Sequence, residues 1–372
     1  MSVNTLAIIG AGQAAIPIIE KAKQMSVTVL AFARQDSYAK DMVDIFIEEN
    51  SFDIDFMVEK CREYSVNGVM ATSELTTEVA AGLAHRLGLP GNDIENGFAG
   101  KNKYVMRCRV SALQSVSQPT FELYKPGWEY HYPVVIKPTD ACGKRGVGLA
   151  YDEQELLQLV GLAAANSSDG EVLVEEYLDG GKEYSVECLS FAGQHQVIQY
   201  TEKESSGPPH FVEIAHHQPA DLTETMKQRI CVAVDDILSV LGLNCGMAHL
   251  ELKIINDRVF FIEVGARGGG DHIAEVLTVK STDFDYFRAA IECSLGIYKL
   301  VEPHSVAYSG IYFHCKQNSY LNRLFEKAEF ADWCVANTVT NNSYPDAVSN
   351  VTASDSGFII YCSDHKITLA DA

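Results

Sequence analysis

Paired cysteines, long apolar runs and a basic leader are all missing from this 372-residue sequence. Its ten cysteines include no Cys-x-x-Cys pair, which argues against a disulfide framework or a zinc site and favours reduced thiols. No apolar stretch approaches the roughly 20 residues that cross a bilayer. No basic segment precedes an apolar run at the N-terminus. We therefore expect a cytoplasmic protein with no membrane partner.

Positive charge is also scarce, with 29 Lys and Arg residues against 50 Asp and Glu residues and a formal net charge of −21. A chain this acidic repels phosphate backbones and anionic surfaces, so nucleic acid is not an expected partner. A nucleotide could bind only at a local cluster of cations. The composition, 47% hydrophobic and 21% charged, is that of an ordinary globular protein, and the length suits two or three packed lobes.

The first hundred residues alternate strands and helices. A strand at 6–9, the loop GAGQAA, a helix at 14–24 and a strand at 27–32 form a βαβ unit, which predicts a parallel sheet. The loop departs from the GxGxxG pattern, and the second strand ends in AFAR without a ribose-binding acid. We expect a Rossmann-like domain that does not hold NAD.

Cations and glycines gather in the next segment. Lys103 opens a predicted helix, and a strand beginning at Tyr132 ends in Lys137 and Pro138. The glycine-rich turn that follows holds Gly143, Lys144, Arg145, Gly146 and Gly148. Backbone amides in such a turn can face an anion, although the GKS or GKT of a P-loop is absent. An ordinary basic surface turn is the alternative.

The middle of the chain returns to regular structure. A strand at 171–175 leads into Glu176, Tyr177 and Leu178, and residues 182–189 alternate as another strand. Residues 201–219 are polar and contain prolines, so we expect an irregular loop there. Helices are expected at 222–241 and 280–296.

Two acids oppose each other on a predicted hairpin. If residues 256–258 form a three-residue loop, Ile255 pairs with Val259 and Glu251 lies opposite Glu263. This register places six residues on the core face: Leu250, Leu252, Ile254, Phe260, Ile262 and Val264. Facing like charges destabilise a sheet, so the pair suggests a bound cation such as Mg²⁺, which bridges carboxylates to phosphates. A solvated face with scattered charge is the alternative.

The order of these segments resembles that of the ATP-grasp superfamily over residues 5–300. The segments are the glycine loop, the lysine helix, the Lys-Pro strand, the glycine-rich turn, the EEYL segment and the two acids. Within this superfamily, AHLELK, FIEVGARGGGDHI and SGPPHFVEIAHHQP resemble carboxylate-amine ligases related to L-amino acid ligases. The resemblance implies an α/β and α+β multidomain fold. Its parts are a Rossmann-like preATP-grasp domain at 1–98, a two-lobed ATP-grasp domain at 99–300 with a lid subdomain at about 115–185, and a β-rich part at 301–372 packing on the ATP-grasp core.

The resemblance also implies roles for individual residues. Glu251 and Glu263 would hold Mg²⁺ or Mn²⁺, and Lys137 and Arg267 would be catalytic. The ATP-binding set would be Lys103, Lys137, Gly143, Lys144, Arg145, Gly146, Glu176, Tyr177, Leu178 and Glu183. The substrate-binding set would be Phe211, Glu213, Arg267, Gly268, Gly269, Asp271 and His272. His210, His216 or His217 could replace Glu213 in taking a proton from the incoming amine. The family's usual asparagine two residues after the second acid is Gly265 here, where water would take its place.

The implied reaction is attack of a substrate carboxylate on the γ-phosphate of ATP, followed by attack of an amine on the acyl-phosphate to give an amide. The partners would be a small-molecule acid and amine, free or on a carrier, and a homodimer is compatible with the sequence. Two alternatives stay open. One is an enzyme of the biotin carboxylase or purine-pathway type that activates bicarbonate, and the other is a non-catalytic nucleotide-binding protein.

Overall fold

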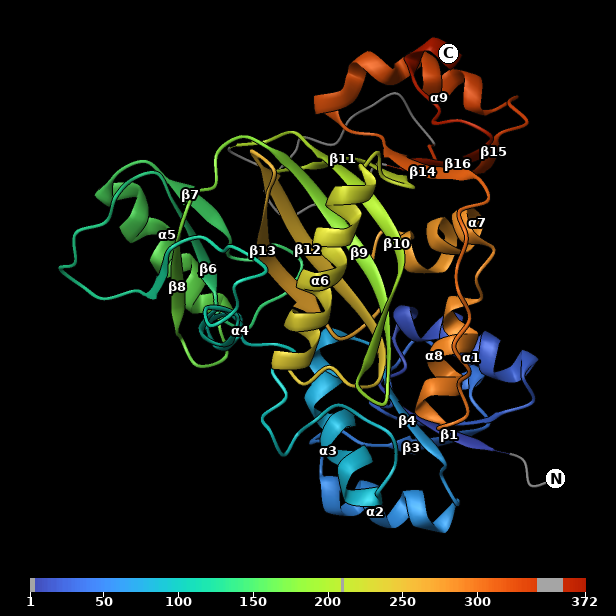
Figure 1. Cartoon of the computed structure of the whole chain (residues 1–372). Helices are drawn as coiled ribbons and strands as arrows, with labels where there is room; N and C mark the ends of the chain where they lie inside the picture. The colour runs from blue at the N-terminus through green and yellow to red at the C-terminus, as the bar shows by residue number, and fades with distance from the viewer. Residues whose placement is uncertain (1–3, 209–210, 340–356) are drawn as a thin grey trace.

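The structure, a computed structural model, describes residues 4–208, 211–339 and 357–372. His210, one of the alternatives to Glu213, lies outside these ranges. Figure 1 shows the N-terminal sheet at one end of a large central sheet, and a smaller sheet beside the central one. Across the described residues, no helix combines the length and the apolarity needed to cross a membrane.

The N-terminal sheet is parallel, as the βαβ pattern predicts. Its order is β3-β2-β1-β4, built from β1 (Thr5–Ile9), β2 (Thr28–Ala33), β3 (Ile45–Glu48) and β4 (Gly68–Ala71). Helix α1 (Ile16–Gln24) packs on one face, whereas α2 (Ile54–Glu63) and α3 (Thr77–Leu87) pack on the other. Cover on both faces explains why β1 is buried throughout, with a continuous apolar run after Thr5 rather than an alternating pattern.

The smaller sheet is antiparallel and carries the glycine-rich turn. Its order is β5-β8-β6-β7, from β5 (Phe121–Leu123), β6 (Val134–Pro138), β7 (Gly148–Ala150) and β8 (Val172–Glu176). Helix α5 (Glu153–Asn166) covers one face. Helix α4 (Lys103–Val110) precedes this sheet and is capped by Asn102, whose side chain accepts from the Val105 amide.

The central sheet has eight strands in the order β13-β12-β9-β10-β11-β14-β16-β15. They are β9 (Lys182–Phe191), β10 (Gln194–Ser205), β11 (Glu213–Gln218), β12 (Gly246–Ile255), β13 (Arg258–Gly265), β14 (Tyr308–Phe313), β15 (Cys334–Asn337) and β16 (Phe358–Ser363). Helix α6 (Glu224–Val240) packs on it, and α9 (Asn322–Ala328) lies near the C-terminus. Strand β14 pairs with β11, so the C-terminal strands continue the central sheet. The mixed α/β and α+β architecture is confirmed, while the domain boundaries stay predictions.

Two expectations about regular structure were wrong. Residues 201–219 are not an irregular loop, because β10 and β11 occupy most of them. The polar residues that resemble a loop are strand residues whose charged side chains pair across the sheet. The helix expected at 280–296 is two helices, α7 (Thr278–Thr282) and α8 (Tyr286–Ser294). Asp283 has a φ of 54° and ends the first, and the Asp285 side chain caps the second.

In the hairpin of β12 and β13, Glu251 lies opposite Glu263 as predicted, although the loop and the register differ from those predicted. The loop has two residues, Asn256 and Asp257, both with positive φ, so Ile255 pairs with Arg258 and not with Val259. A register shift between Glu251 and Leu252 then restores the pairing of Glu251 with Glu263. The expected core face was wrong in part, since Phe261 and Val259 are buried there, whereas Phe260 and Ile262 are not.

Candidate functional site

A cavity of about 230 Å³ lies between the smaller sheet and the central sheet. Many of the residues singled out in the sequence line it: Lys103, Lys137, Gly143, Lys144, Glu176, Tyr177, Leu178, Glu183, Phe211, Glu251 and Glu263. Other lining residues carry charges that the sequence did not point to, namely Glu175, Lys203 and Lys253. The cavity therefore gathers cations and acids from both sheets in one place.

Each of the two facing acids is held by a lysine. Glu251 Oε1 lies 2.6 Å from Lys203 Nζ, and Glu263 Oε2 lies 3.6 Å from Lys103 Nζ. Burial would raise the pKa of Glu251, but Lys203 and His249 hold it well below its usual value. Burial would lower the pKa of Lys103, yet the nearby carboxylates, Glu263 first, raise it. Glu251 is therefore ionised and Lys103 is charged.

These two carboxylates fit a hard divalent cation. No group of three or more His, Cys, Asp or Glu side chains suited to a metal occurs in the described part of the chain. Mg²⁺ is commonly held by one or two carboxylates, with water and substrate phosphates completing its shell. A pair of facing carboxyl groups beside lysines in a cavity matches that mode and not an all-protein cage.

Lys137 belongs to a buried ion network that the sequence did not reveal. Its Nζ lies 2.6 Å from Glu175 Oε2, while Arg107 Nε lies 2.5 Å from Glu175 Oε1. Arg107 also donates to the carbonyl of Phe261 at 3.0 Å, in the strand that carries Glu263. Burial would raise the pKa of Glu175, but the two cations lower it to about 2. The network thus connects Lys137 to the hairpin that carries Glu263.

The lowered pKa of Glu175 predicts how the free energy of unfolding depends on pH. A carboxyl group whose pKa is depressed by folding stabilises the protein above its unfolded pKa, and this contribution is lost as the pH falls through the folded pKa. We expect the difference in free energy of unfolding between wild type and Glu175→Gln to be constant above about pH 4.5 and to shrink toward pH 2. Urea titrations of both proteins across this range measure it. A difference that grows with acidity would contradict the assignment.

The glycine-rich turn reaches across the cavity to the central sheet. Lys144 Nζ donates to the carbonyl of Phe211 and to Glu213 Oε1, both at 2.7 Å. Gly143 and Gly146 have positive φ, which glycine adopts without strain. Arg145 bonds back to Cys142, and neither Arg145 nor Gly146 lines the cavity.

The segment Glu176 to Leu178, which is expected to bind ATP, contacts strand β12. Lys253 Nζ donates to the carbonyl of Leu178 at 2.7 Å and lies 3.8 Å from Glu183 Oε1. The Glu176 carboxylate instead accepts from the amide and hydroxyl of Thr120. The Tyr177 ring lies 6.2 Å from that of Phe211, which makes an aromatic wall.

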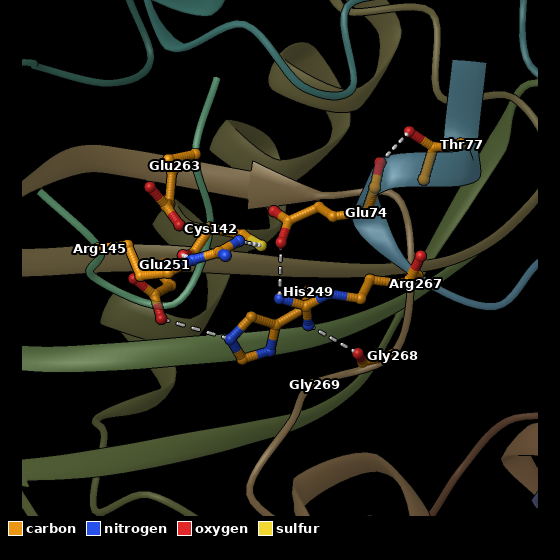
Figure 2. Close-up of polar contacts among 12 residues, drawn as sticks. Glu74, Thr77, Cys142, Arg145, His249, Glu251, Glu263, Arg267, Gly268 and Gly269 are labelled. Atoms are coloured by element: carbon orange, nitrogen blue, oxygen red, sulfur yellow. Dashed lines mark hydrogen bonds and ion pairs between the residues drawn. The ribbon is translucent and has the colours of Figure 1, made fainter. Parts of the chain in front are cut away.

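Arg267 lies beside the acids but does not line the cavity (Figure 2). Its Nη2 is 3.2 Å from Glu74 Oε2, and its Nη1 donates to the Gly268 carbonyl at 2.9 Å. Glu74 follows β4 at the carboxyl edge of the parallel sheet, where ligands commonly bind, and that position is the signal the sequence offered. A Cβ atom at Gly265 would stand 3.3 Å from Glu74 Oε1, so the glycine at this position leaves room for Glu74.

The remaining residues predicted to bind substrate have different partners in the structure. Glu213 Oε1 lies 3.5 Å from Lys203 Nζ, while its Oε2 is buried without a hydrogen-bond partner. Asp271 Oδ2 lies 3.8 Å from Nε2 of the buried His216. Of the predicted substrate-binding set, Phe211 lines the cavity, whereas Glu213, Arg267, Gly268, Gly269, Asp271 and His272 do not. His272 pairs with Glu275 and packs on the Phe358 ring. His217 bonds Tyr361 instead of Glu213.

A buried acid and histidine lie behind the facing acids. His249 Nδ1 lies 2.5 Å from Glu187 Oε1, and both side chains are almost fully covered. Burial would lower the pKa of His249, but Glu187 raises it to about 9. The sequence held a signal for His249, because residues two apart on a strand share a face and His249 precedes Glu251 by two.

Comparisons with known proteins show which domain the chain contains and which folds it shares. Residues 130–275 match the model of the ATP-grasp domain. The L-amino acid ligase from Bacillus licheniformis has a similar structure, with a TM-score of 0.79 and 22% identity over 98% of this chain and 94% of that one. N5-carboxyaminoimidazole synthetase from Staphylococcus aureus, complexed with ADP, has a TM-score of 0.73 and 15% identity over 98% and 95%. The TM-scores show a shared fold, and at these low identities they show the fold alone.

Proteins that are similar in sequence align with a smaller share of the chain. Dapdiamide A synthase from Enterobacter agglomerans is 27% identical over 59% of this chain and 55% of its own length. An uncharacterized protein of Sinorhizobium fredii is 28% identical over 63% of this chain and 50% of its own. The chain thus spans about half the length of these relatives.

Proposed function

We propose that this chain, which carries an ATP-grasp domain in residues 130–275, is an ATP-dependent carboxylate-amine ligase that forms an acyl-phosphate and then an amide. The observation that carries the proposal is the cavity in which Glu251 and Glu263 share walls with Lys103 and Lys137. Arg267 lies beside these acids and adds a cation for a second anionic group. The similarity to an L-amino acid ligase and to dapdiamide A synthase supports the same class of reaction.

The first step needs positioning and charge more than a protein nucleophile. Lys103 and Lys137 are point charges suited to the phosphates of ATP, and each would exchange its present carboxylate partner for a phosphate oxygen. The glycine-rich turn would close over the triphosphate and exclude water. Mg²⁺ held by Glu251 and Glu263 would neutralise charge that develops during phosphoryl transfer.

The second step needs a neutral amine near the acyl-phosphate. Glu213 Oε2 is a buried acceptor without a partner, so an incoming ammonium group would satisfy it and could lose a proton to it. Arg267 would bind the substrate carboxylate and then the oxyanion of the tetrahedral intermediate, because its planar fork matches both. Asp271, Gly268 and Gly269 would form the nearby wall.

A screen for ADP release over pairs of amino acids, with mass detection of dipeptide products, tests this proposal. We expect at least one pair to give stoichiometric ADP, phosphate and amide in the presence of Mg²⁺. ADP release that depends on bicarbonate and not on amino acids would instead support the carboxylating reaction of the purine-pathway type. Nucleotide binding without ADP release for any pair would favour a non-catalytic protein.

A further inference from the structure

The acid and histidine behind the metal-binding face are paired across neighbouring strands. Glu187 of β9 is the register partner of His249 of β12, and their side chains meet at 2.5 Å. Glu187 is completely buried and the His249 side chain is 8% exposed. A buried charge is tolerated only when it is paired and its remaining hydrogen-bonding atoms are used, so the other contacts of this pair identify what it holds.

Those other contacts lead to two different parts of the site. His249 Nε2 lies 3.5 Å from Glu251 Oε1, at the proposed metal end (Figure 2). Glu187 Oε2 accepts from the Gly269 amide at 2.9 Å, in the loop that follows Arg267. One buried pair therefore connects a carboxylate for the cation with the loop for the substrate.

The loop rests directly on the pair. A Cβ atom at Gly269 would stand 2.6 Å from Glu187 Oε1 and 2.7 Å from His249 Nδ1. No other residue type could bring the main chain this close without a shift of the buried side chains. The glycine at 269 is thus explained by contact with the pair, in addition to any approach of substrate.

We propose that Glu187 and His249 are positioning residues that hold Glu251 and the Arg267 to Gly270 loop at a set separation. This inference rests on the proposed function, in which these two parts bind the cation and the substrate acid. Phosphoryl transfer between them depends on that separation, because a misplacement of about 1 Å can cost roughly a hundredfold in rate. Both side chains are buried behind the facing acids, so each would act through its partner.

Three variants separate the two connections. His249→Asn keeps a donor near the Nδ1 position for Glu187 but no longer reaches Glu251. Glu187→Leu removes the acceptor for Gly269 and leaves His249 without its carboxylate, whereas Glu187→Gln retains an acceptor and a donor. The readouts are Mn²⁺ affinity in the presence of ADP, by titration, and hydrogen exchange of the peptide spanning residues 265–273.

His249→Asn should weaken Mn²⁺ binding about tenfold, the usual effect of losing a partner behind a metal ligand, with loop exchange changed less than about twofold. Glu187→Leu should weaken Mn²⁺ binding to a similar degree and accelerate exchange of the loop about tenfold. Glu187→Gln should recover most of both. Neither readout requires turnover, so a protein that makes no amide but shows this pattern would refute the ligase proposal alone.

His195→Gln is the matched control. His195 lies in the same sheet and bonds Ser190 Oγ at 2.8 Å and Ser239 Oγ at 3.1 Å, with no link to the acids. It should lower the melting temperature and leave both readouts unchanged. The inference is overturned if the Glu187 and His249 variants change only the melting temperature, or if the two readouts move together in His249→Asn.

Discussion

Replacing Glu263 with glutamine is expected to reduce amino acid dependent ADP formation by about a thousandfold, a loss typical of removing a preorganised electrostatic contact in the transition state. Glu263 and Glu251 are the only cross-strand carboxylate pair that lines the described cavity. Glutamine keeps the shape and the strand register but removes the charge that would hold the cation. Lys103, 3.6 Å away, would also lose its carboxylate partner.

The measurement is initial-rate ADP release with the amino acid pair identified in the screen. Asp257→Asn is a suitable control, because it removes a carboxylate from the tip of the same hairpin, and asparagine tolerates the positive φ there. Its activity should match that of wild type. Unchanged activity in Glu263→Gln would exclude this acid from metal binding.

Replacing Arg107 with alanine is expected to lower the free energy of unfolding by about 3–5 kcal/mol, because one partner of a buried ion pair is removed and the other is left uncompensated. Arg107 and Glu175 are 2% and 3% exposed. The Phe261 carbonyl also loses the hydrogen bond that it accepts from Arg107. Lys137 alone would remain to neutralise Glu175.

Urea denaturation of single and double variants measures this effect. Arg107→Met combined with Glu175→Leu should recover part of the loss, since paired apolar replacements of buried ions are often neutral. The recovery should be incomplete, because Lys137 then loses its carboxylate partner. Arg86→Ala is the control, because its bond to Asp55 joins two exposed side chains and such pairs contribute about 1 kcal/mol or less. Equal losses for Arg107→Ala and Arg86→Ala would contradict the role assigned to burial.

Short local patterns in the sequence predicted many of the residues that line the cavity. Glycine and cation spacing located the turn at 143–148, and strand alternation placed Glu251 opposite Glu263. The pairing was right although the loop length was wrong, because a two-residue loop and a register shift compensate each other. An irregularity inside a strand leaves no trace in hydrophobic alternation, so Phe261 could not be distinguished from Phe260 as the core residue.

The sequence by itself determined which type of chemistry to propose, since the lysines, glycines and acids expected of a phosphate site are short motifs with recognisable spacing. Only the tertiary structure decided their partners. The paired residues are separated by tens of residues or more along the chain. The pairs are Arg107 with Glu175, Lys203 with Glu251, Glu74 with Arg267, and Glu187 with His249. Ion pairing and close packing act through space in a medium of low dielectric constant, where strand order and register decide which charges meet.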